Sequence, residues 1–266
     1  MNHSGNFALV TGASSGIGWH ISEELARRDY NIIAVSDQES RLEELKLNLE
    51  QAYNISVLKL HMDLAKENAA TQIFDFCEEQ GLQVEVLVNN AGMLVYGEAL
   101  SVDYSQVKAI LQLHVSTPGL LCRLFGEKMI DSGKGFILNV SSISSVMPYP
   151  TISLYGPTKA FLRYFTRAIR TEMQPFGIRV TCLLPGATNT TFYKNSNFSI
   201  DRGKRIGIVK NPGKVAASGV NALFKDRAEC IPGFLNKLIV NLLPLLPYFI
   251  IRLIYRRLLS SRGITE

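Results

Sequence analysis

A glycine-rich turn between an apolar run and a helical pattern is the feature that most constrains the fold. The apolar run at residues 7–10 is typical of a buried strand, and the turn TGASSGIG at 11–18 follows it directly. Apolar residues then recur at helical spacing from Ile21. Glycines allow a tight turn and a close backbone approach, and a helix N-terminus presents free N–H groups to an anion. This order of elements therefore predicts a site for the phosphates of a nucleotide.

Strand-like runs alternate with amphipathic helical patterns along most of the chain. This alternation predicts a parallel sheet with helices on both faces. The predicted strands lie near 6–11, 31–36, 55–60, 84–89, 134–141, 178–184 and 230–232, and the predicted helices near 16–28, 39–53, 66–80, 103–131, 153–175 and 212–225. The polar stretch 195–211 is interpreted as a substrate loop. We expect one domain over 1–233 and a separate C-terminal extension over 234–266.

Composition agrees with a single α/β domain. The 266 residues are 47% hydrophobic and 19% charged, which excludes a disordered chain. The four cysteines are widely spaced and fit no metal-ligand pattern, so we expect reduced thiols, no metal site and a cytoplasmic location. We expect no secretory signal before the first strand, since residues 1–6 are short and polar. The net charge of +5 accompanies no nucleic-acid-binding motif, and no such partner is predicted.

Tyr155 and Lys159 form a candidate catalytic pair. Their spacing of four places them on one face of a helix. A neighbouring cation favours the phenolate and lowers the pKa of a tyrosine from its usual ~10, which makes the phenol usable as a general acid/base. Ser142, thirteen residues before the tyrosine, could hold a carbonyl or alcohol oxygen against the phenol. A tyrosine and a lysine at this spacing are common on exposed helices. The catalytic interpretation is supported by the predicted nucleotide-binding turn earlier in the chain.

Five separated segments resemble the pattern of the short-chain dehydrogenase/reductase family. In order they are the turn 11–18, Asp63, Asn-Asn-Ala-Gly at 89–92, the set Ser142, Tyr155 and Lys159, and Pro185-Gly186 followed by Thr188 and Thr190. The resemblance covers residues 6 to about 190. It implies a Rossmann-like, doubly wound α/β fold and reversible hydride transfer between a nicotinamide cofactor and a carbonyl/alcohol pair. We also expect a homo-oligomer, either a dimer or a tetramer.

The resemblance also implies which residues meet the cofactor. Asp63 would accept a hydrogen bond from the adenine amine, and Thr188 and Thr190 would meet the carboxamide and the pyrophosphate. Helix capping remains an alternative for Asp63, as does simple turn chemistry for the two threonines. The predicted cofactor-binding set is Gly12, Ser14, Ser15, Gly16, Ile17, Gly18, Asp37, Asp63, Leu64, Asn90, Ala91, Gly92, Tyr155, Lys159, Pro185, Thr188 and Thr190.

Asp37, at the end of the second predicted strand, bears on the choice between NAD and NADP. Its carboxylate can accept hydrogen bonds from a ribose diol and would repel a 2′-phosphate. Family members that prefer NADP often carry arginine at this place, and many carry a basic residue where this chain has Ser15. Both positions favour NAD, although Arg41, one turn further on, could reach a phosphate. A helix N-cap is the alternative role for Asp37.

Two departures from the family pattern concern the catalytic residues. His114 stands where the family usually has an asparagine that helps to hold a water for a proton relay. An imidazole can donate and accept, so His114 is a candidate supporting residue, and a tolerated substitution or weakened turnover are the alternatives. Pro157 lies between Tyr155 and Lys159, which a helix tolerates in its first turn. Tyr155 is therefore expected at the start of its helix.

The stretch 234–259 is very apolar, is interrupted by Pro244 and Pro247, and carries Arg252 and Arg256 among its cations. It is short for a membrane span. A basic, apolar helix can lie in a membrane interface, and it can equally cover the active-site mouth or pack on a partner subunit.

For the whole chain we expect an oxidoreductase that acts on a small-molecule ketone or alcohol, with a lipophilic or acyl ketone favoured. A cofactor-binding regulatory protein with weak turnover is the alternative function.

Overall fold

The computed structural model describes residues 5–146, 150–190, 192 and 209–260. Its described strands form one seven-stranded parallel sheet in the order β3-β2-β1-β4-β5-β6-β7. The alternating pattern predicted such a parallel sheet, and the doubly wound, Rossmann-like α/β fold is the one that the family resemblance implied. The strands are β1 (Phe7–Thr11), β2 (Asn31–Ser36), β3 (Val57–His61), β4 (Val84–Asn89), β5 (Gly135–Val140), β6 (Ile178–Leu183) and β7 (Glu229–Cys230).

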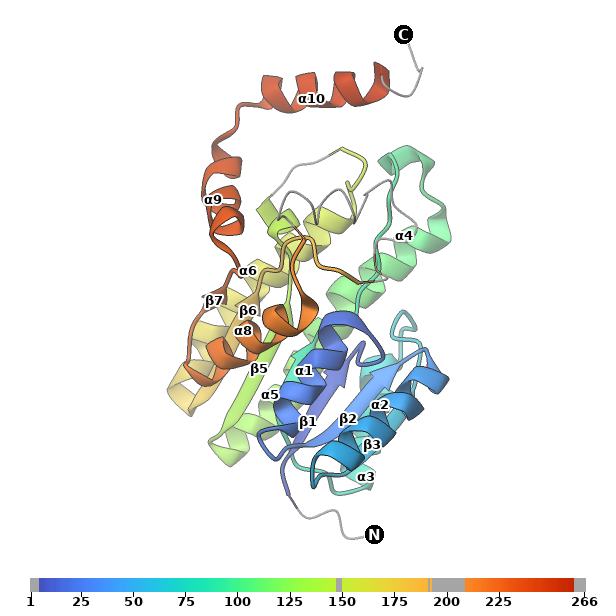
Figure 1. Ribbon diagram of the computed structural model, residues 1–266, viewed down its shortest axis with the longest axis vertical. Coiled ribbons are helices and arrows are strands. Elements are labelled where there is room, and N and C mark those ends of the chain that lie inside the picture. The colour runs from blue at the N-terminus through green and yellow to red at the C-terminus, as the bar shows by residue number, and fades with distance from the viewer. Residues whose placement is uncertain (1–4, 147–149, 191, 193–208, 261–266) are drawn as a thin grey trace.

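Three long helices cover each face of the sheet (Figure 1). One face packs against α1 (Gly16–Ala26), α2 (Glu39–Ala52) and α8 (Pro212–Phe224), and the other against α3 (Ala69–Glu79), α5 (Thr117–Ser132) and α6 (Tyr155–Met173). Because both faces are covered, β1, β4 and β5 are buried along their whole length, which explains their nearly continuous apolar sequences. The shorter elements are η1 (Ala99–Ser101), α4 (Tyr104–Leu111), η2 (Gln112–Ser116), η3 (Ile143–Val146), η4 (Gln174–Phe176), α9 (Phe234–Leu242), η6 (Leu243–Leu245) and α10 (Tyr248–Ser260).

The single helix predicted over 103–131 is interrupted in the structure. The segment α4 passes through a π-helical turn, η2, before α5 begins at Thr117. Pro118 explains the irregularity, since proline has no N–H to donate to the carbonyl of His114 four residues earlier. The turn places His114 in the interior of the protein, where its side chain is only 1% exposed.

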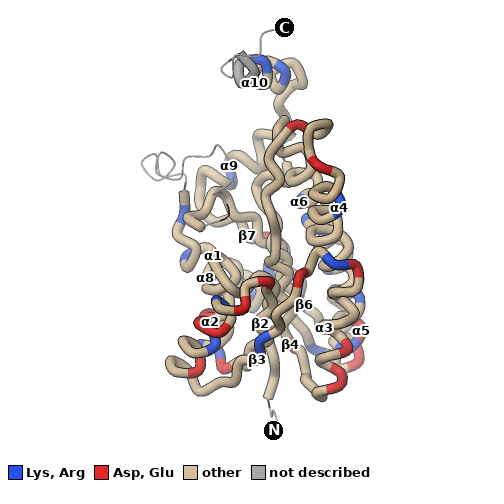
Figure 2. The backbone as a smooth tube through the Cα atoms, turned by 90° about the vertical axis from the view of Figure 1, so that its right-hand side faces the viewer, with Lys and Arg blue, Asp and Glu red and all other residues tan. Residues whose placement is uncertain are grey.

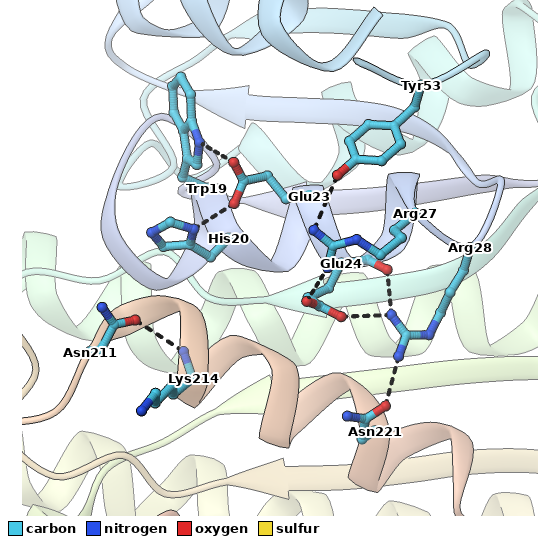
Figure 3. A network of polar contacts seen from close by, with 10 residues as sticks. All are labelled: Trp19, His20, Glu23, Glu24, Arg27, Arg28, Tyr53, Asn211, Lys214 and Asn221. Atoms are coloured by element: carbon cyan, nitrogen blue, oxygen red, sulfur yellow. Dashed lines mark hydrogen bonds and ion pairs between the residues drawn. The ribbon is translucent and has the colours of Figure 1, made fainter.

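Helix α1, whose first turn belongs to the glycine-rich segment, is fixed by polar contacts along its outer side (Figure 3). Arg28 pairs with Glu24 at 2.9 Å and donates to Asn221 of α8 at 2.7 Å. Arg27 donates to the hydroxyl of Tyr53, which follows α2, at 3.2 Å. These contacts hold α1 between its two neighbours and so fix the place of the turn.

The C-terminal extension leaves the sheet after β7. Helix α9 begins at Phe234, and α10 lies at the end of the molecule furthest from the N-terminus (Figure 1). Among the described helices, none is both long and apolar enough to cross a membrane.

Candidate active site

The glycine-rich turn brings the chain from β1 into α1 in a conformation that larger residues would not allow. Gly12 has φ +64°, and a Cβ on Gly18 would lie 2.1 Å from the carbonyl oxygen of Gly12. The first turn of α1 contains no acidic residue, and Ser15 at its N-cap makes no side-chain capping bond. The first N–H groups of a helix have no acceptor within the helix, so this end of α1 offers uncapped donors to an anion. The arrangement fits the pyrophosphate of a dinucleotide.

Thr11 and Asn90 join this turn to the end of β4. The Thr11 hydroxyl donates to the carbonyl of Val88 at 3.1 Å and accepts from the backbone N–H of Asn90 at 2.9 Å. The Asn90 side chain donates to the carbonyls of Thr11 and Gly12, at 3.0 and 3.2 Å. The Asn90 amide therefore braces the turn, while the backbone of Ala91 and Gly92 continues along the edge where a ribose would lie. Thr11 was absent from the predicted set, although it opens the motif.

The end of β2 carries the predicted determinants of cofactor choice. Asp37 directly follows the strand with an exposed side chain, and the N-cap of α2 is Gln38, so Asp37 is not that cap. The Ser36 hydroxyl donates to Ser14 at 2.8 Å, which ties the strand end to the glycine-rich turn. Arg41 pairs with Glu44, and its guanidinium lies 5.8 Å from the centre of the Trp19 ring.

Asp63 and Leu64 follow β3, as predicted. A carboxylate oxygen of Asp63 accepts from the backbone N–H of Ala65 at 2.9 Å, which is a local turn contact. The N-cap of α3 is Asn68, so the capping alternative for Asp63 does not hold for that helix. Leu64 is buried, and its carbonyl accepts from the Thr117 hydroxyl at 2.9 Å.

Tyr155 is the first residue of α6, as the position of Pro157 predicted. Both Tyr155 and Lys159 are buried, at 9% and 4% exposure, and the Lys159 Nζ lies 5.9 Å from the centre of the Tyr155 ring. The ammonium donates to the carbonyl of Val140, at the end of β5, at 3.0 Å. The Ser141 hydroxyl in turn donates to the Lys159 carbonyl at 2.7 Å. The strand end thus anchors the lysine beneath the tyrosine.

Burial affects the protonation of Lys159. It lowers the pKa of Lys159 to about 8, because the charged ammonium loses its hydration inside the protein. The lysine therefore remains mostly cationic at neutral pH but is close to losing its proton. At neutral pH a charged ammonium therefore lies near the ring of Tyr155.

Ser142 lies two residues beyond β5, between the strand end and η3. Its side chain is 7% exposed, and its hydroxyl accepts from the backbone N–H of Ser144 at 3.1 Å. This bond uses a lone pair of the oxygen and leaves the O–H free to donate. The hydroxyl is thus oriented by its own turn.

His114 is bonded through both ring nitrogens. Its Nε2 accepts from the backbone N–H of Met93 at 3.0 Å, so the proton resides on Nδ1, which donates to the Thr158 hydroxyl at 2.9 Å. The Thr158 hydroxyl donates to the Tyr155 carbonyl at 2.9 Å. Burial first, and then the charge of Lys159, lower the pKa of His114 well below 6.5, so the imidazole is neutral at pH 7. Thr158 is a site residue that sequence reasoning missed, because its contact spans 44 positions.

The segment after β6 completes the described site. The Thr188 hydroxyl is buried and donates to the carbonyl of Gly186 at 2.9 Å, and the Thr190 side chain lies close to Gly16 of the glycine-rich turn. Pro185 accepts a backbone hydrogen bond from Ile143 at 3.0 Å, which sets this segment beside Ser142. Most of the predicted substrate loop at 195–211 lies outside the described residues. Within the described part of the chain, no group of three or more His, Cys, Asp or Glu could hold a metal ion.

Comparison with known proteins identifies the family. The model of the short chain dehydrogenases matches residues 6–200, so the chain belongs to the short-chain dehydrogenase family. It is an oxidoreductase of the kind that transfers a hydride between a nicotinamide cofactor and a carbonyl/alcohol substrate.

Two relatives and one solved structure give the scale of the similarity. The very-long-chain 3-oxoacyl-CoA reductase of Rattus norvegicus is 30% identical over 214 residues, which are 78% of this chain and about two thirds (67%) of that protein. The 17-beta-hydroxysteroid dehydrogenase type 3 of the same organism is 30% identical over 245 residues, 90% of this chain and 77% of that protein. The short-chain dehydrogenase from Sphingobium yanoikuyae in complex with NADPH has the same fold, with a TM-score of 0.81, 24% identity and coverage of 98% and 97% of the two chains.

Proposed function

We propose that this protein is a reductase or dehydrogenase of a lipophilic ketone/alcohol pair, with Ser142, Tyr155 and Lys159 as its catalytic residues. The observation that carries the proposal is the placement of Tyr155 at the first position of α6, above a buried lysine that is anchored to the end of β5. Such an arrangement suits proton exchange with an oxygen held at the carboxyl edge of the sheet.

Each of the three residues has a separate role in this proposal. Tyr155 gives a proton to the carbonyl oxygen in reduction and takes it back in oxidation. Ser142 donates a second hydrogen bond to that oxygen, and the bond strengthens as negative charge develops there. Lys159 supports the phenolate through its charge and would hold the ribose next to the nicotinamide. A nicotinamide dinucleotide held in this way would supply or accept the hydride.

The glycine-rich turn would hold the pyrophosphate of the dinucleotide, and NAD is the cofactor we favour. Asp37 follows β2 with an exposed carboxylate, which suits a ribose diol and repels a 2′-phosphate. Arg41 is engaged with Glu44 and Trp19, which reduces its availability for a phosphate. The solved relatives that carry NADPH or NADP keep NADP as the competing choice.

His114 acts in this proposal as a positioning residue for Tyr155. Its ring is neutral and both nitrogens already have partners within the protein, at Met93 and Thr158. The imidazole therefore does not itself move protons. It connects the loop after β4 to the first turn of α6, which carries the tyrosine.

The substrate class rests on the relatives and on the apolar character of the C-terminal region. The names of two relatives specify a very-long-chain 3-oxoacyl-CoA and a hydroxysteroid, which are compounds with large apolar parts. A lipophilic or acyl ketone is the corresponding substrate for this chain. We further propose that the protein is cytoplasmic and forms a homo-oligomer. Its segment 234–259 would contact a membrane surface.

The test is a turnover screen with NADH and NADPH against short, long-chain and steroidal ketones, followed at 340 nm. We expect turnover of the apolar ketones that Tyr155→Phe abolishes, with NADH binding retained in the variant. Thr171→Val, at an exposed threonine on the same helix, is the matched control and should behave as the wild type. Turnover that survives in Tyr155→Phe would refute the catalytic assignment, and nucleotide binding without turnover of any ketone would instead support a regulatory protein.

A further inference from the structure

The C-terminal arm, which we define as residues 234–256, exposes a large apolar surface. Phe234 and Tyr248 are each 78% exposed, Leu245 is 75% exposed, and Phe249 and Leu253 are 69% and 50% exposed. Soluble monomers rarely leave large apolar patches in water, and such surfaces mark sites of interaction. We therefore expect the exposed apolar surface of the arm to be covered by a binding partner.

Within the described residues of the arm, buried side chains attach α9 to the catalytic domain. In α9, Asn236 and Val240 are buried, and Val240 packs with Cys182 and Leu184 of the sheet edge. The Asn236 amide donates to the carbonyl of Pro232 at 2.6 Å. Helix α10 then extends across the end of the molecule, set apart from the sheet in both views (Figure 1 and Figure 2).

The outward side of α10 combines aromatic, aliphatic and cationic residues. Tyr248, Phe249, Arg252, Leu253 and Arg256 are all exposed, and their helical positions fall within one arc of about 140° at 100° per residue. On the opposite side, Ile250 and Ile251 are only partly exposed. A helix with aromatic and basic residues on its exposed side is suited to the headgroup level of a bilayer.

The charge of this region has one sign. Between Ile231 and Thr265 the sequence contains no Asp or Glu, but it contains Lys237, Arg252, Arg256, Arg257 and Arg262. Figure 2 shows basic residues and no acidic ones on α10, whereas α2 and α5 carry both signs. An anionic surface would attract the arm, whereas a second copy of the same face would place cations against cations.

The arm lies at the same end of the molecule as the candidate active site. The strands run away from the N-terminus, so their carboxyl edge, with Ser142 and the first turn of α6, faces the end at which α10 lies (Figure 1). A flat surface in contact with α10 would therefore lie on the side from which a substrate reaches Tyr155.

We infer that the C-terminal arm docks on an anionic lipid surface and holds the active-site mouth against it. Tyr248, Phe249 and Leu253 enter the interface, and Arg252 and Arg256 meet the lipid headgroups. The docking itself stands on the arm alone, and its value for catalysis rests on the proposed function: an apolar ketone dissolved in the bilayer reaches the site without crossing water.

The first experiment measures docking without reference to activity. The full-length protein is sedimented with vesicles of neutral phosphatidylcholine or of phosphatidylcholine with 30% phosphatidylglycerol, at low and high salt. We expect binding to the anionic vesicles that weakens as salt rises. Arg252→Gln with Arg256→Gln should bind about 30-fold more weakly, since each cation near an anionic surface contributes ~1 kcal/mol. Tyr248→Ser with Phe249→Ser and Leu253→Ser should reduce binding at least tenfold.

The matched control removes two exposed cations from α5, with Arg123→Gln and Lys128→Gln, and should bind as the wild type does. Equal loss in this control would show a general charge effect and overturn the docking face. Absence of vesicle binding by the wild type would overturn the inference as well. Dissociation of a wild-type oligomer by the triple serine variant, together with absent vesicle binding, would assign the face to a second copy.

The second experiment tests the orientation of the mouth. Anionic vesicles should lower the KM for a long-chain ketone several-fold and leave the KM for a short, water-soluble ketone unchanged, and the triple serine variant should lose the difference. Equal KM values with and without vesicles would overturn the orientation. If no ketone is turned over under any condition, the proposed function fails while the sedimentation result stands by itself.

Discussion

His114 and Tyr155 are connected through Thr158, whose hydroxyl accepts from the His114 Nδ1 at 2.9 Å and donates to the Tyr155 carbonyl at 2.9 Å. The His114 and Tyr155 rings are also in edge contact, with centroids 5.7 Å apart. The π-helical turn and the start of α6 are thereby held as one unit.

The connection predicts coupled effects on turnover. His114→Ala and Thr158→Val should each lower kcat by about fivefold, because loss of one good hydrogen bond costs on the order of 1 kcal/mol and Tyr155 loses its orientation. The double variant should be little worse than either single one, since both remove the same connection. Additive losses would show that the two residues act separately. The pH dependence of kcat should keep its shape in every variant, because the imidazole does not titrate near neutral pH.

His114 should also make the fold sensitive to acid. Its folded pKa lies well below the unfolded value of ~6.5. Below that unfolded value the unfolded chain binds a proton that the folded protein does not, so the free energy of unfolding decreases as pH falls through 6.5. Urea titrations at pH 7 and pH 5 should show a smaller decrease in His114→Gln than in the wild type. An equal decrease in both would assign the acid sensitivity to other groups.

Lys159 should make the free energy of unfolding depend on pH in the alkaline range. Burial lowers its folded pKa from 10.5 to about 8, so between these values the unfolded chain binds more protons than the folded one. The free energy of unfolding should therefore rise between about pH 8 and pH 10.5, relative to Lys159→Met. The control Lys128→Met, at an exposed lysine of α5, should follow the wild-type curve. Parallel curves for the wild type and Lys159→Met would contradict the lowered pKa.

Asp37 should decide the cofactor preference. The wild type is expected to bind NADH more tightly than NADPH, and Asp37→Arg should narrow or invert the ratio by exchanging a repulsive carboxylate for a cation. Fluorescence titrations of both cofactors at one fixed salt concentration measure this. Asp29→Arg, a charge change in the connection between α1 and β2, is the control. A wild-type preference for NADPH would show that Arg41 or another cation outweighs Asp37.

Gly18 and Gly119 should respond in opposite ways to alanine. A Cβ at Gly18 would meet the Gly12 carbonyl at 2.1 Å, so the turn must shift, at a cost of about 1–3 kcal/mol and with loss of nucleotide affinity. A Cβ at Gly119, within α5, meets nothing within 4 Å. Gly119→Ala should therefore stabilise the protein by about 0.5–1 kcal/mol through helix propensity. Thermal unfolding with and without NADH compares the two variants, and a destabilised Gly119→Ala would contradict the open environment of this position.

Local sequence patterns were sufficient for the sheet and for much of the candidate site. The apolar runs, the turn at 11–18 and the position of Pro157 predicted the strands, the tight turn between β1 and α1 and the placement of Tyr155 correctly. Each of these features depends on neighbours within a few residues, so spacing and propensity determine it. The catalytic and cofactor-binding roles themselves stay predictions.

Contacts between distant segments could not be predicted in this way. The bond from Lys159 to the Val140 carbonyl joins a side chain to a backbone group 19 positions earlier, and no residue type marks that carbonyl. The same holds for Thr158. Nothing in the sequence distinguishes it from other helical threonines, and only the structure shows that it contacts His114. The π-helical turn depends on Pro118, yet a proline in the middle of a predicted helix could equally mark the regular start of a second helix.

Because α9 is attached through few buried side chains, the C-terminal arm should open locally at a lower free energy than the rest of the domain. Asn236 and Val240 anchor this helix, and Gly233, with φ +95°, provides the bend that precedes it. Few buried contacts mean a small free energy for local opening, well below that of the strands. In hydrogen-exchange measurements the amides of α9 should therefore lose protection early, while β1, β4 and β5 remain protected until the whole domain opens.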